Sequence, residues 1–301
     1  MFDIGLVGHV TKDTLTAGRA EKVTPGGASF YAAITLRSLG ARVSVVTKLN
    51  RHDASLLDEL RARDVAVSVT DSASTTTFLN AYPDNPDLRR QLVADVASPF
   101  TEGEVSNLEA DLYYLGPLTN KDIPAGVVRF LAGKGPVALD VQGFTRRIDR
   151  TGERWDLVTQ ADWHEKALVL PHVSIVKANE EEARVLTGDS RPIRMAELLS
   201  EYGPDEVIIT RGSKPALLRA RGKSYWIPSY PPQAVVDPTG SGDTFMAAYL
   251  FYRRLTDSVE EAGKFAAMTA SLKLGVIGPF TGTLGDVREF AVSVGSPIGP
   301  S

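Results

Sequence analysis

The chain has 301 residues, 43% of them hydrophobic, which can bury the core of one large α/β domain or of two small ones. Its formal net charge is −4 without any basic tract, so nucleic acid is not an expected partner. No apolar run approaches the roughly 20 residues that span a bilayer, and the first residues do not resemble a signal peptide. We therefore expect a cytoplasmic protein without membrane contact. The lack of cysteine rules out disulfides and thiolate chemistry, and four histidines offer little for a zinc site.

Short apolar runs alternate with helical patterns along the chain. The predicted strands are almost continuously apolar, which is typical of parallel strands that are buried on both faces. They cover residues 2–7, 43–47, 112–115, 137–141, 173–176 and 207–210. The predicted helices cover residues 29–39, 54–63, 125–131, 180–186, 196–202, 244–255 and 258–274. This alternation predicts an α/β fold, a doubly wound and mainly parallel sheet flanked by helices, with ligands at the carboxyl ends of the strands.

One region breaks the alternation. Two strand patterns, Thr75–Tyr82 and Arg89–Ala94, flank the dense turn cluster Pro83–Asp87. A hairpin inserted in an α/β chain is a candidate lid over a ligand site, although an ordinary surface hairpin has the same pattern. The last segment, 293–301, contains glycine and proline and is predicted to be a loosely held tail.

Asp13 and the pair Gly26-Gly27 follow the first predicted strand. An acid at the carboxyl end of a strand can accept hydrogen bonds from sugar hydroxyls, and paired glycines before a helix admit a ligand close to the backbone. Each feature also has a simpler interpretation, because Asp13 suits a cap and two glycines suit a plain turn.

The most informative stretch runs from Asp237 to Phe245, at the start of a helical pattern. A helix N-terminus offers unpaired N–H groups and a partial positive charge, and glycines let the backbone close around an anion. A carboxylate beside a bound phosphate is repelled, and this cost is tolerable if Asp243 takes a proton from a hydroxyl that attacks the phosphate. The stretch therefore predicts a phosphoryl-transfer site with Asp243 as the base, and the alternative is a turn in which Asp243 caps the helix.

Two rival phosphate motifs are absent, because no Walker loop occurs and Phe245 occupies the place of the third glycine of a dinucleotide fingerprint. The string Asp237-Pro238-Thr239-Gly240-Ser241-Gly242-Asp243 instead resembles the C-terminal signature of the PfkB (ribokinase-like) carbohydrate kinases, usually Asp-Thr-x-Gly-Ala-Gly-Asp. Residues 25–40 resemble the N-terminal signature of the same family, except that Tyr31 stands where many members carry asparagine. The resemblance covers nearly the whole chain.

The resemblance implies a ribokinase-like fold and a single kinase domain over residues 1–301, with a small β lid from about 14–25 and 72–98. It also implies ATP as the phosphate donor and Mg²⁺ as the cofactor. The implied phosphate-binding residues are Gly240, Ser241 and Gly242, and the implied nucleotide-binding residues are Thr210, Gly212 and Thr239. The implied substrate-binding residues are Asp13, Gly26, Gly27, Tyr31, Gln142 and Arg146. Asn179 and Glu182 match the Asn-x-x-Glu element that helps hold Mg²⁺ through water, although acids in a first helical turn also favour the helix dipole alone.

Three short strings look most like the myo-inositol 3-kinase branch found in archaea and plants. They are Thr75-Thr76-Thr77-Phe78, Ala97-Ser98-Pro99 and Asp140-Val141-Gln142-Gly143. Many sugar kinases of the family carry Asp-x-Asn-x-Arg where this chain has Gln142 and Arg146, and Gln142 could equally be structural. The substrate implied first is myo-inositol, and the homodimer that we consider would form through the lid.

Other functions stay open at this point. The chain could phosphorylate another sugar (ribose, fructose, 2-keto-3-deoxygluconate), a phosphosugar or a nucleoside. It could also be a non-catalytic nucleotide or sugar sensor with the same fold. The intact Asp243 argues against a sensor, because a sensor has no need of a costly acid beside phosphate.

Overall fold

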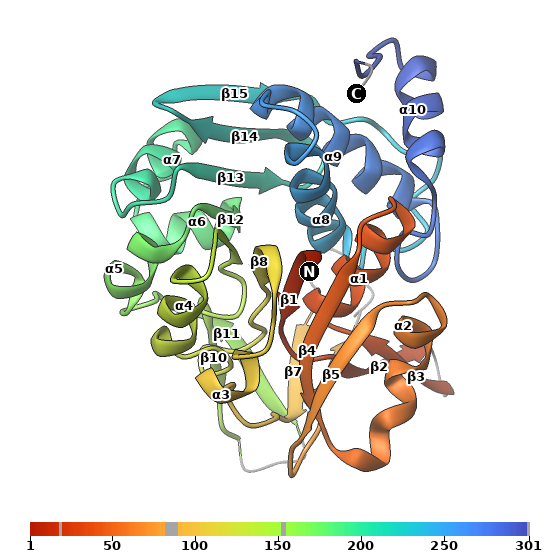
Figure 1. Cartoon of the computed structure of the whole chain (residues 1–301), viewed down its shortest axis with the longest axis vertical. Coiled ribbons are helices and arrows are strands. Elements are labelled where there is room, and N and C mark those ends of the chain that lie inside the picture. The colour runs from red at the N-terminus through yellow and green to blue at the C-terminus, as the bar shows by residue number, and fades with distance from the viewer. Residues whose placement is uncertain (18–19, 82–89, 152–154, 300–301) are drawn as a thin grey trace.

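The computed structural model describes residues 1–17, 20–81, 90–151 and 155–299 (Figure 1). Its main sheet has nine strands in the order β15-β14-β13-β12-β9-β8-β1-β4-β5. The strands from β13 to β5 run parallel, and β14 and β15 add an antiparallel edge. The strands are β1 (Phe2–Val7), β4 (Val43–Leu49), β5 (Ala66–Asp71), β8 (Ala110–Leu115), β9 (Val137–Asp140), β12 (Ile175–Asn179), β13 (Glu206–Arg211), β14 (Lys214–Ala220) and β15 (Lys223–Ile227).

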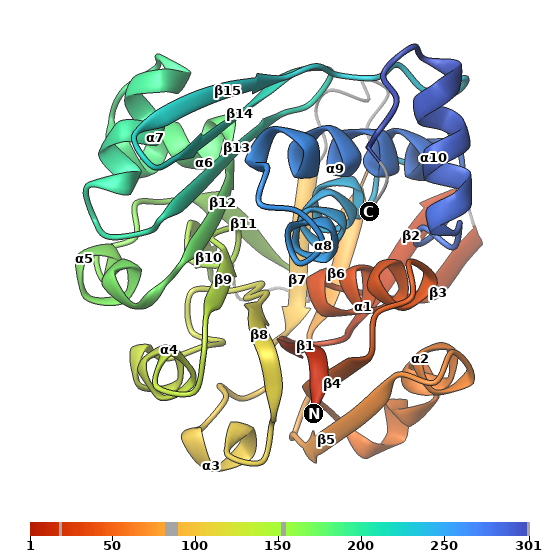
Figure 2. The same ribbon diagram turned by 45° about the horizontal axis from the view of Figure 1, so that its top comes forward.

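Helices cover both faces of the main sheet (Figures 1 and 2). One face carries α1 (Ala28–Ser38), η1 (Arg51–Leu57), α2 (Asp58–Ala62), α8 (Ser241–Arg253), α9 (Val259–Leu274) and α10 (Leu284–Ser293). The other carries α3 (Glu102–Val105), α4 (Ala125–Ala132), α5 (Lys166–Val169), η3 (Leu170–His172), α6 (Glu180–Thr187) and α7 (Pro192–Ser200). Successive strand residues point to opposite faces, so in β13 Val207 and Ile208 are both buried but enter different cores. This double burial explains the almost continuous apolar runs.

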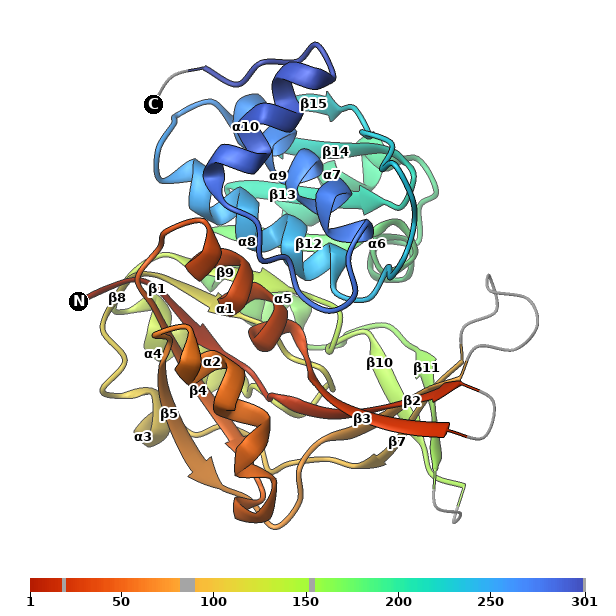
Figure 3. The ribbon, with the colours of Figure 1, turned by 90° about the vertical axis from the view of Figure 1, so that its right-hand side faces the viewer.

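A second sheet of six strands, in the order β10-β11-β7-β6-β2-β3, projects to one side of the body (Figure 3). Its strands are β2 (Thr11–Ala17), β3 (Ala20–Gly26), β6 (Thr77–Ala81), β7 (Arg90–Asp95), β10 (Arg146–Asp149) and β11 (Asp156–Gln160). We call this sheet the lid sheet. It lies at the carboxyl edge of the main sheet, because β1 ends at Val7 and β2 begins at Thr11. The predicted hairpin is present as the antiparallel pair β6 and β7, while its turn cluster, Pro83–Asp87, lies outside the described residues.

Several elements differ from the sequence prediction. The strands β10 and β11 were not predicted, because short polar runs such as Arg146–Asp149 become a sheet only by pairing with β7 through β11. The expected helix 54–63 is split between Leu57 and Asp58, because its first residues belong to the 3-10 helix η1 and only α2 is α-helical. The expected strand 173–176 lies two to three residues further along, at Ile175–Asn179.

The C-terminal segment contacts the body of the protein. Part of the predicted loose tail makes contacts, since the Ser296 hydroxyl lies 3.0 Å from the Tyr230 hydroxyl.

Within the described ranges, no helix has the length and apolar character that crossing a membrane requires.

Candidate active site

The segment Asp237–Asp243 forms a tight turn that ends at the N-terminus of α8. Gly240 is the N-cap and is left-handed, with φ 75° and ψ 6°, and within the described part of the chain no side chain caps the helix. Asp237 holds the turn from behind, because its Oδ1 accepts the Thr239 N–H at 2.9 Å and its Oδ2 accepts the Gly278 N–H at 3.0 Å. Residues 240–243, which we call the anion turn, lie at the positive end of a helix dipole, where N–H groups have no partner within the helix.

The anion turn and the N-terminus of α1 are packed against one another. A Cβ atom at Gly240 would collide with the Tyr31 ring, lying 2.6 Å from its Cε1 atom. Together with the positive φ, this leaves no room for any other residue at position 240. Tyr31, predicted to face the acceptor, is buried in α1 and contributes a ring that supports the anion turn.

A cluster of buried charges lies beside the anion turn. The Nζ atom of Lys177, in the middle of β12, is 2.5 Å from Asp140 Oδ2 and would be 3.1 Å from a Cβ on Gly242. Burial alone would lower the pKa of Lys177, but the charges of Asp140, Glu182 and Asp243 outweigh burial and raise it. Tyr114, in β8, completes the cluster, because burial and the charges of Asp140 and Asp243 raise the pKa of its hydroxyl. The structure thus brings Asp243 together with charges from three other elements.

Asn179 and Glu182, the predicted magnesium pair, form a capping box on α6. The Asn179 side chain accepts the Glu181 and Glu182 N–H groups, and Glu182 Oε2 accepts the Asn179 N–H at 2.8 Å. Glu182 is nevertheless 95% buried, and burial together with the Asp140 charge raises the pKa of its carboxyl to about 7. A residue that only caps a helix does not need to be buried in this way. The two buried carboxylates, Glu182 and Asp140, would interact favourably with a divalent cation nearby. Over the described ranges, no group of three or more His, Cys, Asp or Glu side chains could hold a metal ion directly. The amide oxygen of Asn179 and the carboxylate of Glu182 are of the kind that Mg²⁺ accepts, and Mg²⁺ usually keeps several water ligands.

The predicted acceptor residues gather where the lid sheet joins the body. The Asp13 carboxylate accepts the Thr11 hydroxyl at 2.7 Å and lies against Gly26, where a Cβ would be 2.6 Å from Asp13 Cγ. Gly27 has φ 92° and precedes α1. The glycine pair therefore lets Asp13 and the start of α1 approach each other closely.

Gln142 and Arg146 continue this region from the end of β9. The Gln142 N–H donates to Asp140 Oδ1 at 3.0 Å, and the Gln142 side chain is half-buried. Arg146 opens β10, donates to the Leu118 carbonyl at 3.1 Å and lies 5.7 Å from the centre of the Phe78 ring. Because its charge lowers the pKa of Glu182, Arg146 connects the lid sheet electrostatically with the buried cluster.

A cavity of about 440 Å³ opens on the other side of the anion turn. Two of the predicted nucleotide residues, Thr210 and Gly212, line it together with Ser241 and Gly242. The third, Thr239, directly precedes the anion turn and does not line the cavity. The far wall is mostly apolar and includes Tyr230, Pro231, Val235, Phe245, Ala267 and Leu274.

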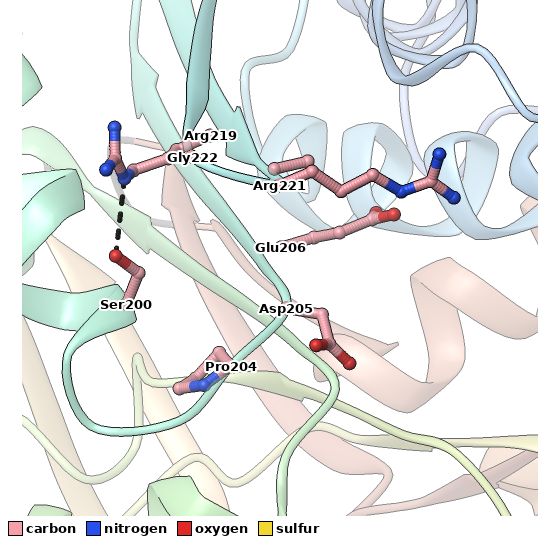
Figure 4. Close-up of a pocket in the computed structure, with 8 residues that line it drawn as sticks. Ser200, Pro204, Asp205, Glu206, Arg219, Arg221 and Gly222 are labelled. Atoms are coloured by element: carbon pink, nitrogen blue, oxygen red, sulfur yellow. Dashed lines mark hydrogen bonds between the residues drawn. The ribbon is translucent and has the colours of Figure 1, made fainter.

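A second cavity, of about 550 Å³, lies at the opposite edge of the main sheet (Figure 4). It is lined at the start of β13 by Glu206 and by Arg219 and Arg221, and Arg219 Nε donates to Ser200 Oγ at 3.3 Å. None of the predicted site residues lines this cavity, and the carboxyl ends of the parallel strands point away from it. We therefore take the smaller cavity, which the anion turn borders, as part of the candidate active site.

Sequence reasoning missed three residues of this region, Lys177, Tyr114 and Lys273. Lys177 interrupts an apolar strand two residues before Asn179. A lysine within a buried strand is unusual, and this was the signal that could have indicated it. Tyr114 gave no signal, because aromatic residues are ordinary in buried strands. Lys273 interrupts the apolar face of α9, where it is completely buried.

Several known kinases are similar to this chain in sequence and in fold. Residues 152–283 match the family profile described as pfkB family carbohydrate kinase. A cytidine kinase of Thermococcus kodakarensis is 27% identical over 83% of this chain and 88% of its own length. A solved pyrophosphate-dependent kinase of the ribokinase family, in a sulfate complex, has 29% identity and a TM-score of 0.83 over 92% of this chain and 97% of that chain. Another structure described as such a kinase, complexed with a pyrophosphate analog and myo-inositol, has 28% identity and a TM-score of 0.81 over the same shares of both chains.

The fold and the site define a phosphotransferase that uses an alcohol group as acceptor. The chain is similar to the PfkB carbohydrate kinases over the matched part of its sequence, and the predicted ribokinase-like fold is confirmed.

Proposed function

We propose that this chain is an ATP-dependent kinase that phosphorylates one hydroxyl of a small polyol, with myo-inositol as the first candidate. One observation carries the proposal: the anion turn and the Asp243 carboxylate share one helix end, beside the buried ammonium of Lys177. Backbone N–H groups and a cation stabilise a phosphoryl group in transfer, while a carboxylate at the same point serves to remove the acceptor proton.

In the proposed reaction, Asp243 takes the proton of the attacking hydroxyl. Ser241 has a smaller part than its motif suggests, because its N–H already donates to the Pro238 carbonyl at 3.2 Å. The charge on the phosphoryl group is then stabilised mainly by the backbone at Gly240 and Gly242 and by Lys177, while Asp140 holds Lys177 in place. When bound, Mg²⁺ neutralises charge on the donor phosphates, and Asn179 and Glu182 would hold its water ligands.

The acceptor would lie between the buried cluster and the lid sheet. Asp13, with the close turn at Gly26-Gly27, would orient its hydroxyls, and Gln142 and Arg146 would contact it from the end of β9. Closure of the lid sheet would exclude water, which is itself a competing acceptor. The homodimer through the lid stays a prediction.

The cavity beyond the anion turn supports ATP as the donor. It begins at Ser241 and Gly242 and continues along apolar side chains of the 228–235 segment and α9. Val235, on the wall of this cavity, is 65% exposed. Pyrophosphate has no group that would cover apolar surface, whereas a nucleotide base would do so.

Two features favour myo-inositol over ribose and fructose. Tyr31 and Gln142 stand where many sugar kinases of the family carry asparagine, and one pyrophosphate-dependent neighbour is described as a complex with myo-inositol. A polar group placed for one pattern of hydroxyls is left unpaired by another, at about 1–3 kcal/mol each. The second candidate is a nucleoside kinase, which the similarity to a cytidine kinase over 83% of the chain favours.

The deciding experiment measures kcat/KM for myo-inositol, ribose, fructose, 2-keto-3-deoxygluconate and cytidine, each with ATP and with pyrophosphate. We expect myo-inositol with ATP to exceed the other acceptors by about tenfold or more, which corresponds to one unpaired polar group. The Asp243→Asn protein, purified in parallel, measures contaminating kinases. A preference for cytidine or a sugar would overturn the acceptor, a preference for pyrophosphate would overturn the donor, and no turnover with any pair would favour the sensor.

A further inference from the structure

A buried lysine lies directly behind the anion turn. Lys273 belongs to the last turn of α9 and is 0% exposed. Its Nζ donates to the Asp237 carbonyl at 2.6 Å and to the Val276 carbonyl at 3.3 Å, and it lies 3.3 Å from Asp237 Oδ2. Three oxygens thus surround one ammonium group that water does not reach.

The same oxygens belong to the two segments that shape the anion turn. Asp237 precedes Gly240 by three residues and caps Thr239, while its other oxygen accepts the Gly278 N–H from the segment after α9. The Val236 N–H donates to the Leu274 carbonyl at 2.8 Å and strengthens this connection. Lys273 therefore sits where the segment before α8 and the segment after α9 meet.

Fold stability alone is a poor reason for this arrangement. A buried ion pair contributes little compared with apolar side chains of the same volume, because both charges lose their water. Burial lowers the pKa of Lys273 and the charge of Asp237 opposes that change, while hydrogen bonds from Gly278 and Thr239 outweigh burial and lower the pKa of Asp237. Without a cation, two carbonyl oxygens and a carboxylate oxygen would face each other and repel.

Carbonyl and carboxylate oxygens in this arrangement are also the ligands that a hard monovalent cation prefers. We propose that the Lys273 ammonium is a built-in monovalent cation that holds the segment Asp237–Gly240 in its phosphate-binding shape, so that turnover needs no free monovalent metal ion. Lys273 is then a positioning residue, since it acts through the anion turn. The inference rests on the proposed role of that turn in binding the donor phosphates.

The test replaces the ammonium and then offers a substitute. Lys273→Met keeps most of the side-chain volume and removes the charge, and Lys264→Met is the matched control, because Lys264 lies on the same helix and pairs with Glu260 at 2.7 Å on the surface. We expect kcat to fall about 10- to 100-fold for Lys273→Met, as a small misplacement of reacting groups does, with KM for the acceptor within about twofold. Addition of K⁺ or NH₄⁺ should recover at least about a tenth of wild-type kcat, and tetramethylammonium, which is too large, should recover none.

Two further readouts do not depend on turnover by the variant. Wild-type activity should not change when K⁺ is replaced by tetramethylammonium at constant ionic strength. The rise in thermal midpoint that ATP causes should be smaller in Lys273→Met than in Lys264→Met, and K⁺ should restore it.

Three outcomes would overturn the inference: activation of the wild type by K⁺, normal kcat in Lys273→Met, or a loss that no monovalent cation reverses. The last would leave Lys273 as a structural residue. Absence of wild-type turnover with every acceptor and donor would instead count against the proposed function, so the two failures are distinguishable.

Discussion

Asp243 is the side chain on which the proposed chemistry depends most. It is half-buried in the first turn of α8, where a negative charge also interacts favourably with the helix dipole by about 0.3–1 kcal/mol. A substitution that keeps the shape of the side chain should therefore affect stability little. Loss of activity without loss of stability in such a variant would therefore indicate a role in proton transfer, whereas loss of stability would indicate a role as a helix cap.

For Asp243→Asn we expect kcat to fall about 10²- to 10⁴-fold, because the amide cannot take the proton of the attacking hydroxyl. ATP should bind with unchanged or higher affinity, since a charge that repels phosphate has been removed. Initial rates and calorimetric titration of ATP measure the two quantities. The control is Asp286→Asn, which removes an acid from the first turn of α10 that bonds to Thr283 and does not line the cavity, and it should leave kcat unchanged. More than about a tenth of wild-type kcat in Asp243→Asn would contradict the role of base.

The lid sheet packs on the smallest of the three hydrophobic clusters of the described residues. Phe78 and Val93 are buried against Ala28 of α1 and Leu118, in a cluster separate from the two main cores. The Arg146 guanidinium lies 5.7 Å from the centre of the Phe78 ring, so one aromatic side chain joins the lid cluster to a predicted acceptor residue. The position of Arg146 therefore depends on the order of the lid sheet.

For Phe78→Leu we expect KM for the polyol to rise about two- to fivefold, because a cation–π contact of about 0.5–1 kcal/mol is lost while apolar volume is kept. KM for ATP should not change, since the cavity beyond the anion turn is lined by other elements. Steady-state kinetics with each substrate varied in turn decide this. Phe130→Leu is the matched control, because the ring of Phe130, on α4, lies 5.9 Å from the Lys134 ammonium and lines neither the cavity nor the lid cluster. An equal rise of both KM values would mean that the substitution acts on the fold.

The Asp3 carboxylate connects the first strand with two arginines that follow it far along the chain. Asp3, at the start of β1, lies 2.8 Å from Arg42 after α1 and 3.0 Å from Arg254 at the end of α8. Burial raises the pKa of Asp3, but hydrogen bonds from Arg42 and the charge of Arg254 outweigh it and lower the pKa to about 2. A lowered pKa in the folded state stabilises the protein above the unfolded value of 3.8, and this stabilisation is lost as the pH falls toward about 2.

For Asp3→Asn we expect the free energy of unfolding to fall by about 1 kcal/mol at pH 7, a modest value because the arginines are partly in solvent and screened. The difference between the two proteins should shrink as the pH falls from about 4 to 2, where the wild-type carboxylate takes up its proton. Urea denaturation at a series of pH values measures this. Parallel curves for the two proteins over that range would show that the pair contributes nothing.

The sequence by itself determined what lies in contiguous residues. The strand Phe2–Val7 was predicted with its observed bounds, because a run buried on both faces is apolar at every position. The helix start and the turn at Gly240 could be predicted from seven adjacent residues, since helix ends and glycine conformations follow from local sequence. The phosphate chemistry of the anion turn stays a prediction. Asp13 and the pair Asn179 and Glu182 were predicted as site residues from short local strings, and these roles stay predictions. Only the structure shows that the pair also caps α6.

Only the tertiary structure decided which distant groups share the site. Lys177 meets Asp140 and the anion turn because parallel strands end at one edge of the sheet, and no local pattern encodes that meeting. Tyr31 supports Gly240 across about two hundred positions of sequence, and Lys273 reaches Asp237 from the end of another helix. The strands β10 and β11 became part of the lid sheet only by pairing with β7. These contacts depend on long-range packing, because burial and charge pairing exist only once the chain has brought both partners together.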